Sequence, residues 1–245
     1  MVCSRLPKRF KLSDFAYAHR GLWGPDGPSE NSLEAFLLAG EMGFGIEFDV
    51  RPSSDGVPIV FHDPLLDRMT SHKGYVAART AEDLTAIPLK DGGHVITLEM
   101  LLRHWPNQTP LLCELKIDGE TDPVSFAKRV GEDLLACEGP VAGMSFSPEA
   151  VAALPKKLVK GQLIQPSEIS GETNLAESPK TKVDYLACHT SDAGNATLQF
   201  ARRDMPLITW TVKDAATCEA LSSITDSQIF EGFDPALAKR HILNT

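Results

Sequence analysis

The sequence has few of the features that mark a specialised class of protein. Only five of its 245 residues are cysteines, and they are scattered and free of any C-x-x-C spacing. This pattern provides neither a disulfide framework nor a zinc signature. Most of the cysteines have apolar neighbours, which predicts buried, reduced thiols of the kind found in the cytoplasm.

Basic runs and long apolar stretches are also missing. A net charge of −9 argues against a nucleic-acid partner, because such binding usually leaves a basic patch. The early Lys and Arg residues precede no apolar segment long enough for a signal sequence, and no stretch is long enough to span a membrane. We therefore expect a cytoplasmic protein without an integral membrane segment.

No internal repeat, low-complexity tract or flexible linker divides the chain, and 42% of its residues are hydrophobic. This length is enough for one sizeable core, so we expect a single domain over residues 1–245. Strand-like and helix-like ranges alternate throughout. The strand candidates are 15–21, 45–50, 58–63, 111–116, 141–146, 158–164, 183–188, 207–212 and 228–233. The helix candidates are 31–42, 97–104, 122–137, 148–154, 196–203 and 215–221, and Ser29 or Asn31 is the expected N-cap of the first.

Repeated β-then-α order with apolar strands predicts an α/β fold, and a TIM-type (β/α)8 barrel is its natural closed form. Nine strand candidates are one too many. The link from Val50 to Pro58 is too short for a helical crossover, so one strand must be irregular, antiparallel or outside the barrel. Residues 64–95, which follow the His62 strand, have weaker periodicity. They are interpreted as a small insertion over the barrel mouth or, alternatively, as a surface excursion without substrate contact.

Two strand candidates carry carboxylates where a buried strand ordinarily has apolar residues. Because side chains alternate between faces, Glu47 and Asp49 share one face of their strand, as Glu114 and Lys116 share one face of theirs. Burying several like charges is costly unless something neutralises them, and a divalent cation is the simplest candidate. Structural ion pairs or solvent-facing carboxylates are the alternatives. The residues leave open whether the cation is Mg²⁺ or Ca²⁺.

Two other strand candidates also end in polar residues. His19 and Arg20 follow the apolar part of the first, and His62 and Asp63 end the third. Because four strand ends carry Glu, Asp, His, Arg and Lys, we predict one polar centre built from several strands.

Taken in order, these segments resemble the glycerophosphodiester phosphodiesterase family. The resemblance covers most of the chain, and its later part includes the barrel strands that contain Phe146 and Trp210. The segments that carry it are His19-Arg20-Gly21, Glu30-Asn31-Ser32, Glu47-x-Asp49, His62-Asp63, Glu114-x-Lys116, Ser145-Phe146 and Trp210-Thr211-Val212.

The resemblance implies a TIM-type barrel that hydrolyses glycerophosphodiesters to sn-glycerol 3-phosphate and an alcohol with a divalent cation. The residue roles that it implies are metal carboxylates at Glu47, Asp49 and Glu114, an acid–base pair at His19 and His62, and phosphate binding by Arg20 and Lys116. Histidine suits proton transfer because its unperturbed pKa lies near neutrality. Which histidine is the acid, and whether water or the substrate's own hydroxyl attacks, stays open.

Other residues carry weaker expectations. Phe146 and Trp210 are expected to wall the substrate pocket, unless they are ordinary core residues. Glu30 is expected either in the metal shell or as a helix cap. The chain departs from the family pattern at Glu231, where a Thr-Asp pair is common, and at Lys213, where Asn is frequent. These departures bear on substrate identity more than on the hydrolytic core.

Two alternatives to the leading function remain at this point. The same barrel acting on a lysophospholipid or sphingolipid, as a phospholipase D does, is the nearest. A non-catalytic barrel that binds a phosphorylated metabolite is the other. The sequence specifies neither the alcohol of the substrate nor the oligomeric state.

Overall fold

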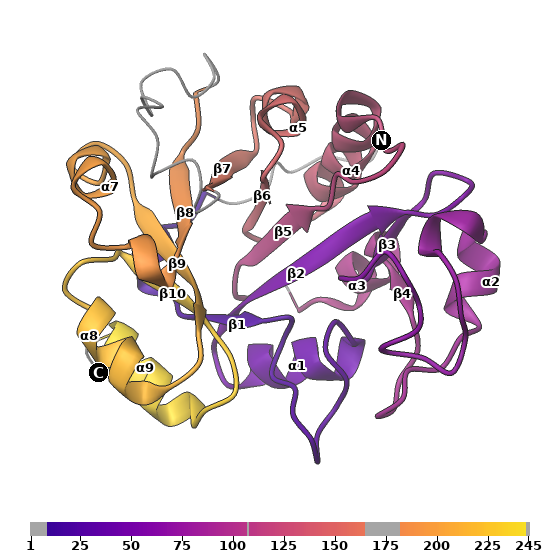
Figure 1. The fold of residues 1–245 in the computed structure, drawn as a ribbon, viewed down its shortest axis with the longest axis horizontal. Helices are drawn as coiled ribbons and strands as arrows, with labels where there is room; N and C mark the ends of the chain where they lie inside the picture. Colours follow the sequence, from indigo (N-terminus) through magenta and orange to yellow (C-terminus); the bar gives the residue numbers. More distant parts are fainter. Residues whose placement is uncertain (1–8, 107, 165–181, 244–245) are drawn as a thin grey trace.

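Eight parallel strands close into a barrel at the centre of the molecule (Figure 1). The structure is a computed structural model that describes residues 9–106, 108–164 and 182–243. Within these ranges the barrel order is β1-β2-β5-β6-β7-β8-β9-β10, and β10 pairs with β1 to close the ring. The predicted TIM-type α/β barrel is therefore confirmed.

The elements follow the predicted alternation. The barrel strands are β1 (Tyr17–His19), β2 (Gly45–Pro52), β5 (Leu111–Leu115), β6 (Val141–Ser145), β7 (Val159–Ile164), β8 (Tyr185–His189), β9 (Leu207–Val212) and β10 (Ser227–Phe230). The helices are α1 (Leu33–Glu41), α2 (Ala81–Thr85), α3 (Leu98–His104), α4 (Pro123–Ala136), α5 (Pro148–Ala153), α7 (Ala196–Ala201), α8 (Ala215–Leu221) and α9 (Pro235–Leu243). Neither α2 nor α9 was expected from the sequence.

The surplus strand candidate, 58–63, lies outside the barrel. β3 (Pro58–Val60) runs antiparallel to the end of β2, and β4 (Ile96–Thr97) runs antiparallel to β3. The turn between β2 and β3 is tight: the Ser53 hydroxyl oxygen accepts a hydrogen bond from the Val57 N–H at 2.9 Å, and Gly56 has a φ of +78°. A turn of this kind joins antiparallel strands only, which explains why no helix separates them.

The segment between β3 and β4 has a small hydrophobic cluster of its own. In Figure 1 this segment, which contains α2, lies to one side of the barrel beyond β2. The cluster consists of Ile59, Phe61, Leu66, Val76, Leu84, Ile87, Leu89 and Val95. That residues 64–95 are an insertion into the barrel stays a prediction.

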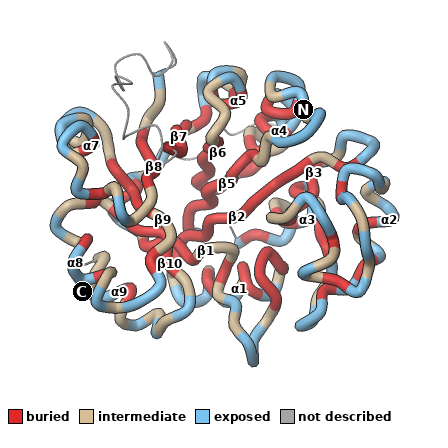
Figure 2. The backbone as a smooth tube through the Cα atoms, viewed as in Figure 1, coloured by how far each residue is buried: buried red, intermediate tan, exposed pale blue. Residues whose placement is uncertain are grey.

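The barrel strands are buried on both faces, and each face belongs to a different cluster (Figure 2). On β2, the side chains of Ile46, Phe48 and Val50 point outward and pack beneath the helices, where the Phe48 ring meets that of Phe36 from α1 at a centroid distance of 5.8 Å. The alternate positions of β2 point into the barrel. The strand therefore separates its apolar and acidic residues by face, as period-2 alternation requires.

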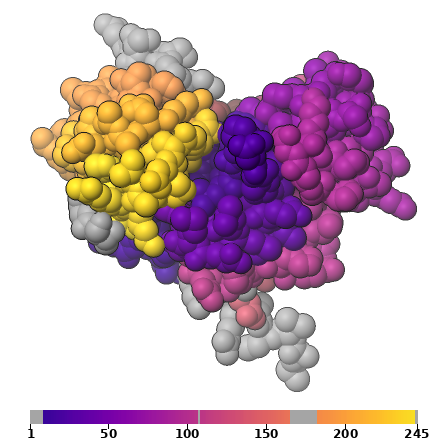
Figure 3. Space-filling view, turned by 90° about the horizontal axis from the view of Figure 1, so that it is seen from below, coloured from indigo at the N-terminus to yellow at the C-terminus, as the bar shows by residue number. Residues whose placement is uncertain are grey.

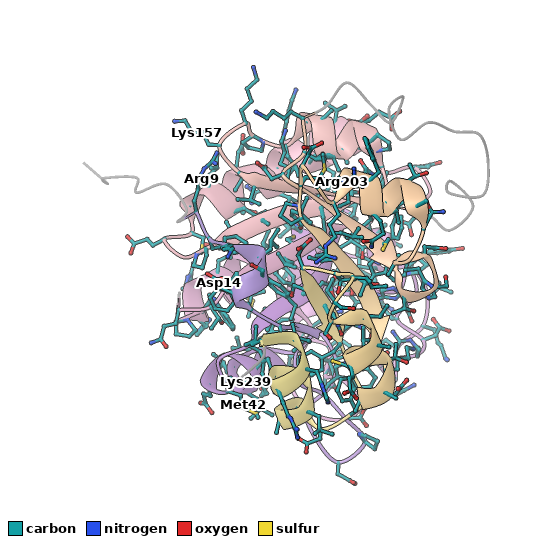
Figure 4. All side chains as sticks on the ribbon, turned by 90° about the vertical axis from the view of Figure 1, so that its left-hand side faces the viewer. Arg9, Asp14, Met42, Lys157, Arg203 and Lys239 are labelled. Carbon is teal, nitrogen blue, oxygen red and sulfur yellow. The ribbon has the colours of Figure 1, made fainter. Side chains whose placement is uncertain are left out.

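The last helix of the chain packs against the first. α9 packs next to the end of α1, where the Lys239 ammonium donates a hydrogen bond to the Met42 carbonyl at 3.2 Å (Figure 4). Figure 3 shows the yellow C-terminal segment against the indigo N-terminal one.

In the described ranges no helix has the length and apolar character that a membrane crossing needs. The cysteines there are buried, and Cys3 lies outside them.

Two tyrosines fill the barrel interior at the amino-terminal ends of the strands. Tyr17 of β1 lies beside Gly45 of β2, and Tyr185 of β8 lies beside Gly161 of β7. A Cβ atom added at Gly45 would lie 2.6 Å from the Tyr17 ring, and one at Gly161 would lie closer still to the Tyr185 ring. Each glycine therefore provides the space for the ring on the neighbouring strand.

We predict that Gly161→Ala destabilises the fold by about 1–3 kcal/mol, the usual cost of overpacking a buried site. The Tyr185 ring has no exposed surface, so it has no free space into which to move. Urea unfolding monitored by circular dichroism measures the difference. Gly194→Ala is the matched control, because a Cβ there meets nothing within 4 Å. Equal unfolding midpoints for the two variants would contradict this account of the barrel floor.

Candidate functional site

The polar residues singled out in the sequence come together at the carboxyl-terminal ends of the barrel strands. Strand pairing sets His19 level with Glu47, and Asp49 level with Glu114. A cavity of about 170 Å³ opens beside them. Its lining residues are His19, Arg20, Glu47, His62, Glu114, Lys116, Met144, Phe146, Leu163, Trp210, Thr211 and Ile229. Eight of the nine predicted site residues line this cavity, and the ninth, Asp49, lies beneath Arg20 and Lys116.

Three carboxylates form the most deeply buried part of the site. Glu47, Asp49 and Glu114 are 2%, 1% and 7% exposed, and one oxygen from each lies within 4.8 Å of the others. Burial raises the pKa of Glu47 well above its ordinary value, and the charges of Asp49 and Glu114 raise it further. Burial likewise raises the pKa of Glu114. Protons or a cation must therefore balance part of this negative charge.

The donor set fits a divalent cation. All the candidate ligand atoms are carboxylate oxygens, which are the ligands that Mg²⁺ and Ca²⁺ prefer. The Oε2 atom of Glu47 is buried and has no hydrogen-bond partner, although buried polar atoms are nearly always paired. An ion bound among the three carboxylates would satisfy that oxygen. Glu47, Asp49 and Glu114 are thus a possible metal site.

Asp49 is also the centre of an ion-pair network. Its carboxylate lies 2.9 Å from the Lys116 ammonium and 3.3 Å from the Arg20 guanidinium. Burial would raise the pKa of Asp49, but these two cations hold it well below its ordinary value. Lys116 also lies 2.7 Å from Glu114. The two cations are therefore counter-ions of the carboxylates, and both still line the cavity.

The loop after β1 places Arg20 by an unusual backbone conformation. Arg20 and Asn31 have φ values of +58° and +56°, in the left-handed region that non-glycine residues seldom adopt. The Asn31 N–H donates to the Arg20 carbonyl at 3.0 Å, and the Asn31 amide donates to Asp49 at 2.9 Å. Asn31 is thus part of the site and not the N-cap of α1. Ser32 is that cap, since its hydroxyl oxygen accepts from the Ala35 N–H.

Each of the two histidines has a carboxylate on its Nδ1 atom. Glu231 lies 2.5 Å from His19 Nδ1, and Asp63 lies 2.7 Å from His62 Nδ1. Burial alone would raise the pKa of both carboxyls, but their hydrogen bonds bring each to about 2. Ionised carboxylates only accept, so each Nδ1 carries the hydrogen. Burial lowers the pKa of His62, which favours its neutral form.

Glu30 has a partner that the sequence did not predict. It is 4% exposed and lies 2.9 Å from the Arg20 guanidinium and 2.6 Å from that of Arg68. Arg68 also lies 2.6 Å from Asp63. Glu30 therefore joins two arginines, in place of the cap or metal-shell position expected for it. No local pattern around Arg68 predicts this contact, because its partners come from other parts of the chain.

Phe146 and Trp210 line the cavity, and other aromatic rings lie beside the site. The Phe146 and Trp210 rings pack edge-to-face at 5.5 Å, and the His189 ring meets Trp210 at 5.3 Å. Trp23, in the loop after β1, donates from its indole nitrogen to the His19 carbonyl at 2.9 Å. The predicted placement of Phe146 and Trp210 beside the site agrees with this geometry, whereas a contact with substrate stays a prediction.

Comparison with known proteins now identifies the family. The sequence model of the glycerophosphoryl diester phosphodiesterase family matches residues 19–228. The chain belongs to this family. The matched range covers all nine predicted site residues and ends just before Glu231.

Curated relatives match parts of the chain. The Bacillus subtilis protein YhdW is 34% identical over 126 residues, which are 48% of this chain and 50% of YhdW. A glycerophosphodiester phosphodiesterase from Caldanaerobacter subterraneus is 41% identical over 74 residues, which are 30% of each chain. The matches therefore span half or less of these relatives.

Solved structures of other phosphodiesterases have the same fold over nearly the whole length. A phosphodiesterase from Oleispira antarctica, in complex with the product sn-glycerol-3-phosphate, has a TM-score of 0.79 and 21% identity over 94% of this chain and 97% of that one. A glycerophosphodiester phosphodiesterase from Parabacteroides distasonis has a TM-score of 0.74 and 23% identity, with coverage of 96% and 98%. At these identities the likeness establishes the fold.

We predict that Mg²⁺ or Ca²⁺ raises the melting temperature of protein first stripped with a chelator. Cation at a hundred times its Kd adds about 2.7 kcal/mol to stability, equivalent to about 5–10 °C for a chain of this size. Differential scanning fluorimetry measures the shift. Glu47→Gln keeps the size of the side chain but removes its charge and should abolish most of the shift. A shift of the same size in that variant would place the ion elsewhere.

Proposed function

We propose that the protein is a metal-dependent phosphodiesterase that cleaves glycerophosphodiesters to sn-glycerol 3-phosphate and an alcohol. The observation that carries this proposal is one cavity lined by Glu47, Glu114 and the two carboxylate-anchored imidazoles, with Asp49 buried beside the two glutamates. Membership of the family supports the reaction class. The Oleispira relative, crystallised with sn-glycerol-3-phosphate, supports the nature of the product.

Neutralisation of charge is the first requirement, because a phosphodiester anion repels nucleophiles. A divalent cation held by Glu47, Asp49 and Glu114 would supply Lewis-acid neutralisation of that charge. Arg20 and Lys116 line the same cavity and bring their positive charges to one wall of it. In the proposed reaction they bind the phosphate while they stay paired with Asp49, so the substrate meets cations that are already fixed in position.

Proton transfer is the second requirement, and His19 and His62 are the proposed pair. One accepts a proton from the attacking hydroxyl, which is either water or the glycerol hydroxyl of the substrate. The other protonates the departing alkoxide. Because each Nδ1 bonds a carboxylate, the atoms available for both transfers are the two Nε2 nitrogens.

The rim of the cavity is the proposed site of substrate selection. Phe146 and Trp210 present an apolar wall on one side. On another side, Arg68 connects the proposed insertion, residues 64–95, to Glu30 and Asp63. We therefore assign this segment a place at the mouth, where it holds Asp63 against His62.

The test is release of sn-glycerol 3-phosphate from glycerophosphocholine with Mg²⁺ or Ca²⁺ supplied. His19→Ala and His62→Ala should each lower kcat by about 10²–10⁴-fold, the usual contribution of a general acid or base. Enzymatic coupling to glycerol 3-phosphate oxidation measures the product. His104→Ala is the control, since His104 is exposed on α3 and is not among the residues that line the cavity.

Full activity in either site variant would reject the assignment of that histidine. A panel of diesters decides between the proposed substrate class and a lysophospholipid or sphingolipid. Calorimetric binding of a phosphorylated ligand without turnover of any diester would instead favour a non-catalytic barrel.

A further inference from the structure

Two positions at which this chain departs from the family pattern contact each other. Lys213 follows β9 and Glu231 follows β10, and these strands are neighbours in the barrel. The Lys213 ammonium lies 3.0 Å from Glu231 Oε1, while Glu231 Oε2 lies 2.5 Å from His19 Nδ1. These contacts form one connected row, Lys213–Glu231–His19. It begins at an exposed lysine, passes through a mostly buried carboxylate and ends at an imidazole that lines the cavity.

The row determines which nitrogen of His19 faces the cavity. Rotation of an imidazole by half a turn about its Cβ–Cγ bond puts a ring carbon in the place of each nitrogen, and a neutral ring carries its hydrogen on one of the two nitrogens. Glu231 is ionised and accepts only, so it selects the form with hydrogen on Nδ1. The Nε2 nitrogen then lies on the cavity side, 3.8 Å from Glu47.

The surroundings of His62 show the same three-part arrangement. Asp63 contacts the imidazole Nδ1, and the guanidinium of Arg68 contacts Asp63. In both places the histidine contacts a carboxylate, and that carboxylate contacts a cation. The two sets of residues come from different parts of the chain. Because the same arrangement occurs at both histidines, we interpret the contact between Glu231 and His19 as a functional part of the site and not as an incidental surface ion pair.

We propose that Glu231, itself held in place by Lys213, is a positioning residue that fixes the tautomer and ring orientation of His19. The two departures from the family pattern therefore act as one unit on the hydrolytic centre and do not select the substrate. The kinetic consequence of this inference rests on the proposed function, whereas the state of the His19 ring does not.

The first experiment compares kcat and KM among variants. Glu231→Ala should lower kcat by about 10–100-fold, as loss of a residue that orients a ligand or catalytic histidine typically does, with KM changed less than about threefold. Glu231→Asp retains a carboxylate and should recover most of the loss. Lys213→Ala should lower kcat by a smaller factor, because Glu231 keeps its bond to His19.

The control for the lysine is Lys157→Ala. Lys157 is an exposed lysine that Figure 4 labels at the periphery of the molecule, so kcat and KM should both stay at wild-type values. A rise in KM without a fall in kcat in Glu231→Ala or Lys213→Ala would show that the pair binds substrate, and it would overturn the inference.

The second experiment reads the ring directly. Nitrogen-15 NMR of the histidine side chains at neutral pH should report hydrogen on Nδ1 of His19 in the wild-type protein and a mixture of tautomers in Glu231→Ala. Thermal melting first confirms that each variant is folded. Unchanged tautomer populations in Glu231→Ala would overturn the inference, whatever the activity. An inactive wild-type protein with the predicted tautomer would reject the proposed function and leave the positioning role supported.

Discussion

The burial of three carboxylates in the interior of a β-barrel is the constraint on which the rest of the site depends. Each carboxylate removed from water loses hydration that the protein must replace. Arg20 and Lys116 replace it for Asp49, and Lys116 also serves Glu114. Glu47 keeps one oxygen without a hydrogen-bond partner. The negative charge of the three carboxylates is therefore balanced only when a further positive charge, from protons or a metal ion, lies among them.

This constraint explains features that lie at some distance from the carboxylates. Arg20 contacts Asp49 from a left-handed backbone conformation, and Asn31, in the same conformation, fixes that loop. Glu30 in turn accepts from Arg20 and so holds the guanidinium in place. Removal of one partner from a buried ion pair costs about 3–5 kcal/mol, because a charge is left without compensation. The strained loop is thus stabilised by the charges that it organises.

The sequence was sufficient for the features that depend on local periodicity. Alternation along 45–50 separates the acidic face of β2 from its apolar face, and repeated β-then-α order leads to the barrel. The short link after Val50 also predicts correctly that one strand is irregular, antiparallel or outside the barrel. These features follow from residues that are close together in the chain, or from a repetition along its whole length.

Contacts between distant parts of the chain could not be predicted in the same way. His62 and Asp63 are adjacent in sequence, so their pairing is a reasonable expectation, whereas His19 and Glu231 are 212 positions apart. Arg68 meets Glu30 across 38 positions, in a segment with weak periodicity. Ser29 or Asn31 was expected as the helix cap because their types suit that role, but Ser32 is the cap, and the left-handed backbone gives Asn31 another place. Closure of the barrel, which local patterns do not encode in detail, determines these contacts.

The two tyrosines at the floor of the barrel restrict how a molecule can enter and leave the site. Tyr17 and Tyr185 fill the barrel below the carboxylates with no exposed surface. In the part of the chain that the structure describes, the cavity is therefore a blind-ended chamber and not a passage. A molecule that reaches the acidic centre must leave through the opening by which it entered. A product that dissociates slowly therefore delays the binding of the next substrate molecule.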